Sequence, residues 1–458
     1  METLTVRIER MAPEGSGIGR VQGRVVFVPF AAAGDLLEVE VTAAKPTYLR
    51  ARILRVLEPG PGRVMPRCPL HFDPSRSGPA CGGCDWQHLD GERQLQAKRD
   101  IVADALKRIA KTGLAPVEPV LPSPRAWTYR NKVQVPFGRA PDPGAPALAG
   151  FYSAGSHRIV PLEECPVQTD LSVRILRRVR DLAAGLGWRP YEEDTGRGWL
   201  RHLFIRTNSE GQALVAIVTR DESLPRGSEF VREARSSFPQ VVGLYQNVQP
   251  LRTSVILGPV WKRLWGSRGL KERVGRLRFI CSPGSFLQVN SEAAALLYDQ
   301  ALAALTEGGR AFPLAFDVYC GVGAISLWIA GRTGRVVGIE GSRTAVQDAI
   351  LNARANGVRN VRFLAGRAEG LLAKAIREAA GPAAAVVDPP RGGLTPPVLR
   401  GLTARAIERV VYVSCDPATF ARDAGYLGRS GLRLRRVQPL DLFPQTSHVE
   451  IVALLDRT

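Results

Sequence analysis

The first 58 positions alternate between apolar and polar residues. Stretches such as "LTVRIERMA", "GRVVFVPF" and "DLLEVEVTAAK" place an apolar side chain at every second position, which is the period of a β-strand with one buried face. Glycines separate these stretches and mark the turns between them. Several short strands this close together predict a small closed β-barrel over residues 1–58.

Helical spacing replaces this alternation after residue 90. Leu95, Val102 and Leu106 recur on one side of a helix in "DGERQLQAKRDIVADALKRIAKTG", and Asp90 stands where an N-cap residue is expected. We expect a helix within residues 90–124 that packs on the C-terminal domain.

Two segments on either side of this helix have a mixed character. Residues 59–89 are rich in Pro, Gly and Cys. Residues 125–280 combine strand-like runs such as "ALVAIVTR" with helical stretches such as "DLSVRILRRVRDLAAGLG". Together the two segments predict a central α+β domain.

The C-terminal part of the chain, residues 281–458, has an α/β rhythm. Apolar strands in "FPLAFDVYCGVG", "RVVGIE", "AAAVVDPP" and "RVVYVSCDP" alternate with helical stretches. This order predicts a doubly wound parallel sheet, in which ligands bind outside the carboxyl ends of the strands. The residues at such ends are Asp317, Glu340, Asp388 and Cys415.

The charge of the chain indicates a polyanionic partner. Lys and Arg number 62 against 43 Asp and Glu, which gives a formal net charge of +19. Basic side chains bind phosphates and release counterions, so this excess favours nucleic acid. No window reaches the ~18 apolar residues of a membrane span, and the N-terminus lacks the apolar core of a signal peptide. We therefore expect a cytoplasmic protein with reduced thiols and no membrane partner.

A cofactor site is predicted where the first strand of the α/β sheet ends. The glycines of "DVYCGVG" allow the backbone to approach a ligand closely, and Glu340 at the end of the next strand can hold two ribose hydroxyls. The pattern fits both NAD and S-adenosylmethionine. The turn lacks the full G-x-G-x-x-G motif that a pyrophosphate prefers, which favours S-adenosylmethionine.

Three reactive side chains lie in or beside apolar strands. Asp388 follows a buried strand, and the two prolines after it hold its direction. Cys415 follows another strand, so it is either a small core residue or a partly exposed nucleophile. Glu450 lies beside an apolar run, where an acid is costly unless it is paired or acts as a base.

A separate group of cysteines predicts a metal site. The motif "CGGC" supplies two thiols, and one cysteine on each side along the chain completes a set of four: Cys68, Cys81, Cys84 and Cys165. Four thiolates fit either zinc or an iron–sulfur cluster, and the spacing does not choose between them. His71 and His88 flank the set as weaker alternative ligands.

These motifs together resemble the RNA uracil-5-methyltransferases, especially their bacterial 23S ribosomal RNA branch. The resemblance extends over nearly the whole chain and rests on the barrel, "CGGCDWQH", "TYRNKVQ", "GSFLQVN", "DVYCGVG", "DPPRGGL", "SCDPATFARD" and "HVEIVALL". It implies a class I, Rossmann-like methyltransferase domain preceded by a TRAM-type OB barrel and a central domain with a 4Fe–4S cluster. It also implies S-adenosylmethionine as cofactor and 23S ribosomal RNA as substrate. We expect the protein to be a monomer.

The resemblance assigns a role to each candidate residue. Cys415 matches the nucleophile that adds to C6 of uracil, and Glu450 matches the base that removes the C5 proton. The cofactor and uracil pocket corresponds to Gln288, Tyr319, Glu340 and Asp388. The ligands of the 4Fe–4S cluster correspond to Cys68, Cys81, Cys84 and Cys165. The RNA-facing segment of the family corresponds to "TYRNKVQ", with Arg130 and Lys132.

The chain departs from the family pattern at two places. Cys68 and Cys81 are separated by 12 residues, "PLHFDPSRSGPA", which is longer than usual, so the loop between these ligands must bulge. Arg367 stands where many relatives carry an acid near the adenine. One adenine contact is therefore missing or is supplied by another group.

Three alternative functions were compared with this one. A tRNA uracil-5-methyltransferase shares the chemistry, but such enzymes generally lack the barrel and the cysteines, so residues 1–90 argue against it. RNA cytosine-5-methyltransferases usually carry a Pro-Cys motif and a second cysteine, and neither is evident. A non-catalytic RNA-binding protein is disfavoured by the presence of Cys415, Glu450, Gln288 and Asp388.

Overall fold

The computed structural model describes residues 2–76, 78–111, 115–139, 147–379 and 381–458. Its N-terminal part is a closed barrel with the strand order β1-β2-β3-β5-β4. The five strands are β1 (Thr3–Met11), β2 (Gly17–Val21), β3 (Arg24–Val28), β4 (Leu36–Ala44) and β5 (Tyr48–Glu58). Alternate side chains, among them Val6, Val26 and Leu37, fill the interior, as the alternating sequence predicts.

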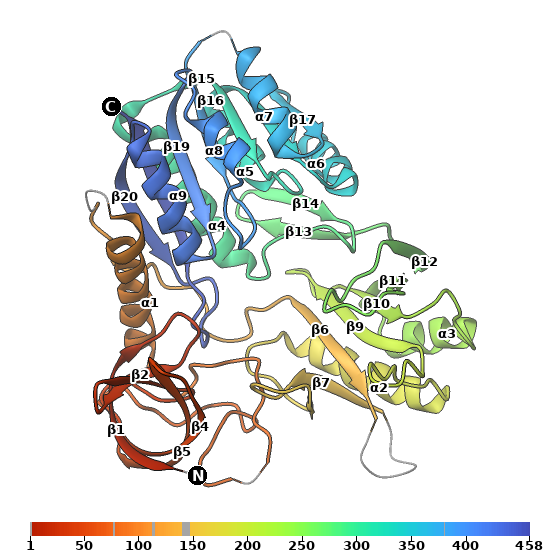
Figure 1. The fold of residues 1–458 in the computed structure, drawn as a ribbon. Coiled ribbons are helices and arrows are strands. Elements are labelled where there is room, and N and C mark those ends of the chain that lie inside the picture. The colour runs from red at the N-terminus through yellow and green to blue at the C-terminus, as the bar shows by residue number, and fades with distance from the viewer. Residues whose placement is uncertain (1, 77, 112–114, 140–146, 380) are drawn as a thin grey trace.

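A long helix connects the barrel to the C-terminal sheet. Helix α1 (Gly91–Ala105) begins at Asp90, whose carboxylate accepts a hydrogen bond from the Arg93 amide, and it continues as a short π-helical turn. Its buried side packs on β1 of the barrel and on helix α9 (Pro417–Arg429) and strand β20 (Leu432–Leu440) of the C-terminal domain. Figure 1 shows α1 standing between these two parts of the molecule.

The central part is a seven-stranded sheet with the order β12-β11-β10-β9-β6-β7-β8. Its strands are β6 (Lys132–Gly138), β7 (Leu148–Tyr152), β8 (Ile159–Pro161), β9 (Leu200–Thr207), β10 (Ala213–Thr219), β11 (Val241–Val248) and β12 (Val260–Gly266). Helices α2 (Asp170–Gly185) and α3 (Gly227–Ser237) pack on one face. The other face carries a smaller apolar cluster that includes Phe204 and Tyr245. A hairpin of β13 (Leu270–Val274) and β14 (Leu277–Cys281) leads to the C-terminal domain.

The C-terminal domain contains a second seven-stranded sheet, ordered β17-β16-β15-β18-β19-β21-β20. The strands besides β20 are β15 (Phe312–Val318), β16 (Thr333–Glu340), β17 (Val361–Ala365), β18 (Ala383–Val387), β19 (Ile407–Ser414) and β21 (Glu450–Arg457). Strand β21 pairs antiparallel with both of its neighbours, whereas the pairs from β17 to β19 are parallel. The predicted α/β fold with an N-terminal barrel is confirmed.

Helices cover both faces of this sheet and bury two apolar cores. One face packs against α7 (Ala368–Arg377), α8 (Pro396–Leu402) and α9, and the other against α4 (Ser291–Thr306), α5 (Ala324–Ile329) and α6 (Arg343–Ala355). Figure 1 shows this layered arrangement in its upper half. None of the helices in the described ranges is long and apolar enough to cross a membrane.

Candidate active site

The antiparallel direction of β21 places Cys415 and Glu450 at the same edge of the sheet. Ser414, the last residue of β19, pairs with Ile451 near the start of β21. Cys415 follows Ser414 and Glu450 precedes Ile451, so the two residues leave neighbouring strands at the same level. A thiol and a carboxyl group that lie far apart in the sequence are thereby brought together.

The turn that carries Cys415 is held on both sides. The Asp416 amide donates to Ser414 Oγ at 3.1 Å, and the Asp416 carboxylate accepts from the Thr419 amide at 2.8 Å. Asp416 is thus the N-cap of α9, with Pro417 in the first turn. Cys415 therefore sits just ahead of a helix N-terminus, whose partial positive charge favours a thiolate.

Other features of the surroundings of Cys415 raise the pKa of its thiol. Burial raises the pKa of Cys415 to about 11, and the nearby carboxyl groups of Glu450 and Asp388 add to this effect. The guanidinium group of Arg391 acts in the opposite direction. Loss of the thiol proton therefore requires a change in this charge balance when substrates bind.

Asp388 and Glu450 form a pair of carboxyl groups beside the thiol. Asp388 directly follows β18, and its amide donates to the Val318 carbonyl at 3.2 Å. Burial raises the pKa of Asp388 to about 7, and burial together with the charge of Asp388 raises the pKa of Glu450 to about 8. Neither carboxyl group forms an ion pair with a residue that the structure describes. Asp388 keeps some contact with solvent, whereas Glu450 is only 4% exposed.

The turn after β15 has the shape of a cofactor cradle. Tyr319 and Gly321 adopt positive φ angles of 70° and 53°. A Cβ atom on Gly321 would meet only the Phe286 carbonyl oxygen, at 3.9 Å, so the space above this glycine is open. Glu340 closes the turn by accepting hydrogen bonds from the amides of Gly321 at 3.1 Å and Ser342 at 2.7 Å.

A buried acid below this turn has spare hydrogen-bonding capacity. Asp317 in β15 accepts a hydrogen bond from Ser326 Oγ at 2.6 Å through one carboxylate oxygen. Its other oxygen, Oδ1, is buried and has no partner among the described residues. Burial raises the pKa of Asp317 to about 7. An open glycine turn with an unpaired acceptor beneath it fits a bound nucleoside cofactor.

The loop before α4 carries Gln288 and an exposed aromatic ring. Arg206 holds this loop by donating to the carbonyl oxygens of Ser285 and Leu287 at 3.3 and 2.7 Å. Gln288 is buried, but Phe286 is 56% exposed and lies 5.7 Å from Lys132 Nζ. The sequence did not single out Phe286, because a single aromatic residue next to Leu287 gives no sign of its exposure.

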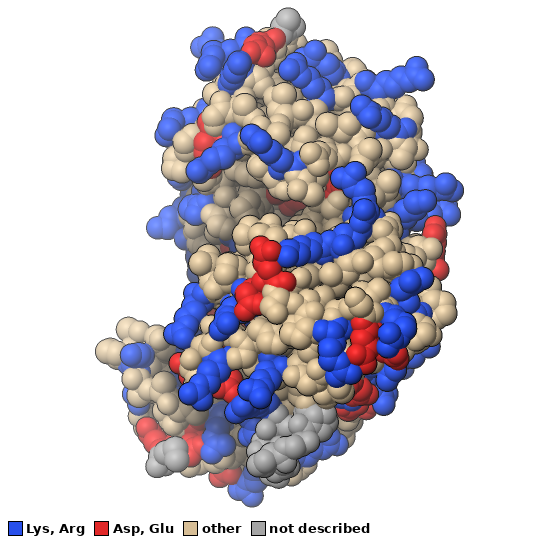
Figure 2. Space-filling view, turned by 90° about the vertical axis from the view of Figure 1, so that its right-hand side faces the viewer, with Lys and Arg blue, Asp and Glu red and all other residues tan. Residues whose placement is uncertain are grey.

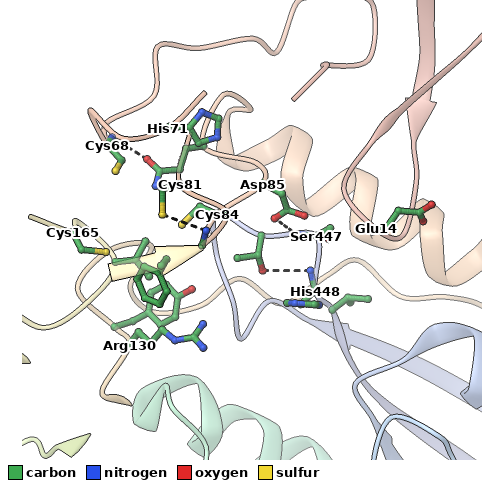
Figure 3. Close-up of a pocket in the computed structure, with 18 of the residues that line it drawn as sticks. Glu14, Cys68, His71, Cys81, Cys84, Asp85, Arg130, Cys165, Ser447 and His448 are labelled. Atoms are coloured by element: carbon green, nitrogen blue, oxygen red, sulfur yellow. Dashed lines mark hydrogen bonds between the residues drawn. The ribbon is translucent and has the colours of Figure 1, made fainter. Parts of the chain in front are cut away.

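A cavity of about 700 Å³ lies between the cysteine loop and Cys415. It is lined by the four predicted ligand cysteines and also by Cys415, Arg130, Arg391 and His448. Figure 3 shows the side chains of Cys68, Cys81, Cys84 and Cys165 gathered on one side of this cavity. This cavity is not lined by Gln288, Tyr319, Glu340, Asp388 or Glu450.

The loop between Cys68 and Cys81 folds back on itself. The Cys81 amide donates to the Leu70 carbonyl at 2.8 Å, and the Arg76 guanidinium donates to Pro69 at 2.8 Å. These contacts close the loop, so Cys68 still faces the other cysteines despite the long spacing. His71 also lines the cavity, whereas His88 is turned towards the barrel and contacts the Ala31 carbonyl at 3.0 Å.

The four predicted ligand thiols line the same cavity. Burial and mutual repulsion raise the pKa of Cys81 to about 11 and of Cys84 to about 12, so these thiols are neutral without a metal. Among the described residues no group of three or more His, Cys, Asp or Glu side chains is arranged to hold a metal ion. A single zinc ion needs every sulfur about 2.3 Å from one point. An iron–sulfur cluster is larger, and each thiolate binds a different iron.

Arg367, where an acid was expected, points into solvent. Its side chain is 85% exposed and forms a 3.5 Å ion pair with Glu369 at the start of α7. Glu369 in turn accepts a hydrogen bond from Thr395 at 3.3 Å. Tyr319, whose pKa is raised by burial and by Glu369, lies beside these groups.

Comparison with known proteins places the chain in a family. A model described as tRNA (uracil-5-)-methyltransferase matches residues 270–458, and one described as TRAM domain matches residues 1–54. A curated protein of Halalkalibacterium halodurans, named an RNA methyltransferase, is 38% identical over 99% of this chain and 97% of its own. A protein of the same name from Gloeobacter violaceus is also 38% identical, over 100% and 97%.

A solved structure agrees over the whole fold. It is that of Pyrococcus abyssi tRNA (uracil-54, C5)-methyltransferase in complex with S-adenosyl-L-homocysteine. It is 27% identical, has a TM-score of 0.76, and covers 99% of this chain and 100% of that chain. This protein therefore belongs to the S-adenosylmethionine-dependent RNA uracil-5-methyltransferases and carries an N-terminal TRAM domain.

Proposed function

We propose that the protein methylates C5 of uridine in RNA through a covalent bond between Cys415 and C6 of the base. The observation that supports this most directly is the position of Cys415 and Glu450 on neighbouring strands, at the same edge of the sheet. Asp388 ends the adjacent parallel strand at that edge. This shared edge supports the proposal that a nucleophile, a base and a second carboxyl group act on one uracil ring.

The proposed reaction has three steps: addition of the thiolate, methyl transfer, and proton removal with release of the thiolate. Cys415 Sγ, as thiolate, forms a bond to C6, and the electron pair of the C5–C6 double bond moves towards O4 to give an enolate. The now nucleophilic C5 forms a bond to the methyl group that bound S-adenosylmethionine would supply, as the S–CH3 bond breaks and S-adenosylhomocysteine is left. The Glu450 carboxylate then takes the C5 proton, the double bond re-forms, and the thiolate of Cys415 leaves C6.

We propose that the cofactor and the uracil are held by four residues: Gln288, Tyr319, Glu340 and Asp388. Glu340 lies at the ribose end because it closes the glycine turn. Arg391 and the N-terminus of α9 stabilise negative charge on Cys415. Arg130, which lines the cavity, and Lys132 are proposed to bind RNA phosphates.

Two substitutions test the covalent mechanism. Cys415→Ala is expected to abolish methyl transfer while RNA binding survives, and Cys281→Ala, which removes a thiol outside the cavity, is expected to keep activity. Glu450→Gln is expected to trap a covalent adduct with RNA, visible as a slowly migrating band on a denaturing gel. Substantial methylation by Cys415→Ala, or normal turnover without adduct by Glu450→Gln, would reject these roles.

We also propose that Cys68, Cys81, Cys84 and Cys165 bind a 4Fe–4S cluster with a structural role. The reaction transfers no electrons, so a redox role is not required. Anaerobic purification is expected to yield equal amounts of bound iron and acid-labile sulfide, and Cys84→Ser is expected to lose both. Cys281→Ser is the matched control. Zinc at one equivalent in place of iron would contradict the proposal.

The RNA substrate is proposed to be 23S ribosomal RNA, on the strength of the motif resemblance. Transfer RNA is the second candidate, because the Pyrococcus abyssi relative named for tRNA aligns with 99% of this chain. The presence of residues 1–90 therefore does not argue against a tRNA enzyme, contrary to the expectation from the sequence. Mapping of 5-methyluridine in both RNAs from cells with and without the protein decides between them. A monomer in the cytoplasm remains part of the proposal.

A further inference from the structure

A second cavity lies beside the cofactor edge but apart from Cys415. It has a volume of about 450 Å³, within the ~300–1,000 Å³ of pockets that hold small ligands. One wall comes from β11 and β12 of the central sheet, with Tyr245, Trp261 and Arg263, and Arg268 lies just beyond β12. The other wall comes from the C-terminal domain and contains residues 282–284 and the start of α6.

Trp261 provides an aromatic surface in this cavity. Its indole is half-buried and packs edge-on against Tyr245 and Phe204, with ring centroids 6.3 Å apart in both pairs. A Cβ atom on Gly284 would lie 3.1 Å from the indole Nε1, so the absence of a side chain lets this loop lie close against the ring. The indole N–H donates no hydrogen bond to any described residue, so it is free to donate to a ligand in the cavity.

The cavity also carries two positive charges without acidic neighbours. Arg263 and Arg268 are exposed, and neither forms an ion pair or a hydrogen bond with a residue that the structure describes. By contrast, Lys262, which directly precedes Arg263 in the chain, is paired with Glu222 at 2.5 Å. Figure 2 views the molecule from the side of β12 and shows Lys and Arg side chains spread around a hollow on this face.

The position of the cavity connects it to the proposed reaction. Residues 282–284 continue into the loop that bears Phe286 and Gln288, and the Phe286 carbonyl is the nearest atom to the open side of Gly321. On the opposite wall, Ser342 and Thr344 follow directly on Glu340. A ligand here is therefore next to the cofactor turn without entering it.

We propose that this cavity binds an unreactive nucleotide of the substrate RNA, with its base against Trp261 and its phosphates at Arg263 and Arg268. The inference rests on the proposed RNA methylation. An enzyme that works on a base inside folded RNA must take that base out of its stack. The flanking nucleotides then lose a stacking partner, and aromatic side chains replace it without regard to base identity.

Binding of a fluorescein-labelled single-stranded oligouridylate, measured by anisotropy, tests the site. Trp261→Ala is expected to weaken binding roughly 5- to 150-fold, which corresponds to about 1–3 kcal/mol. Trp265→Ala is the matched control, because Trp265 is in the same strand but packs with the opposite apolar cluster and with Arg235 at 4.2 Å. Unchanged affinity of Trp261→Ala, or no binding by the wild-type protein, would overturn the site.

The two arginines provide a test that does not depend on a core substitution. The double variant Arg263→Gln/Arg268→Gln is expected to lower the slope of log Kd against log salt by about 1–2. The reason is that RNA binding releases fewer counterions when one or two phosphate contacts are missing. Arg232→Gln on α3, which faces Glu233 at 3.5 Å, is expected to leave the slope unchanged. An equal slope in the double variant and the wild type would contradict the phosphate contacts.

A parallel methylation assay keeps this inference separate from the proposed function. Methyl transfer to unmodified 23S ribosomal RNA and tRNA transcripts is measured at low and at saturating RNA. We expect the Trp261 variant to raise KM and to keep kcat. If the Trp261 variant binds oligouridylate more weakly but the wild type methylates neither RNA, the site is supported and the proposed function is rejected. If the wild type methylates RNA and the Trp261 variant has the same KM and affinity, the proposed function is supported and the site is rejected.

Discussion

A buried ion pair between α1 and the segment before β21 gives the sharpest prediction about stability. Lys98 is fully buried, and its Nζ lies 2.5 Å from Asp441 Oδ1 and 3.2 Å from the Phe443 carbonyl. Asp441 is only 5% exposed. No other described residue donates a hydrogen bond to its carboxylate. Lys98→Met keeps an unbranched side chain that is one atom shorter, and it leaves Asp441 as a buried charge without a partner.

The expected loss of stability follows from this unpaired charge. Removal of one partner of a buried ion pair costs about 3–5 kcal/mol, against a total folding stability of roughly 5–15 kcal/mol for typical domains. The double variant Lys98→Met/Asp441→Asn removes both charges and is expected to recover most of the loss. Lys107→Met, in the exposed part of the same helical segment, is expected to change stability by less than ~0.5 kcal/mol.

Urea unfolding followed by hydrogen exchange of peptides from β21 measures this effect in the relevant domain. Whole-chain unfolding of a protein with several domains proceeds in steps, so a local probe is needed. The same variant should slow methyl transfer, because Gln94 and Asp85 hold Gln445 and Ser447 in the segment that leads to Glu450. This prediction is refuted if Lys98→Met lowers the free energy of unfolding by less than ~0.5 kcal/mol. It is also refuted if Lys98→Met/Asp441→Asn is no more stable than Lys98→Met.

The remaining predictions concern the carboxyl pair and the cofactor turn. Burial raises the pKa of Glu450 from 4.5 to about 8, so the folded state binds more protons than the unfolded state between these values, and the contribution of Glu450 to stability falls as pH rises through this range. In urea unfolding, the free energy of unfolding of Glu450→Gln should therefore equal that of the wild type near pH 4 and exceed it by a few kcal/mol near pH 8. A difference in this free energy that does not change with pH would contradict the raised pKa of Glu450. Because a base must be ionised, the single-turnover rate of the wild type should rise with pH up to about 8. Gly321→Val should weaken S-adenosylhomocysteine binding more than tenfold in calorimetry, since its side chain would project into the open cradle, and the exposed Gly357→Val, also at positive φ, controls for backbone strain. Equal affinity of the Gly321 variant and the wild type would place the cofactor elsewhere.

Local sequence patterns were sufficient for most of the fold. Strand alternation in the barrel and the α/β rhythm after residue 281 depend on which side chains of a single element are buried, and this shows in near neighbours. The same reasoning places Asp388 and Cys415 directly after apolar strands, where the structure has them. The cysteine motif likewise identifies the loop that carries it, and the four cysteines line the cavity shown in Figure 3.

The features that complete the site depend on contacts between distant parts of the chain. The direction of β21, which brings Glu450 beside Cys415, is decided by pairing with β19 and β20 rather than by the composition of β21. The partner of Lys98 lies 343 residues away, so no periodicity of α1 reveals it. The orientation of His88 towards the barrel and the exposure of Phe286 are likewise set by neighbours from other domains.

The amino-acid sequence by itself thus determined the elements, their order and the residue types that carry chemistry. The tertiary structure alone decided which of these residues face one another: the carboxyl pair beside the thiol, the closed loop that returns Cys68 to its set, and the Trp261 cavity between two domains. The physical reason is that burial patterns arise within one element, whereas a site is formed by side chains from several elements that meet only after the chain has packed.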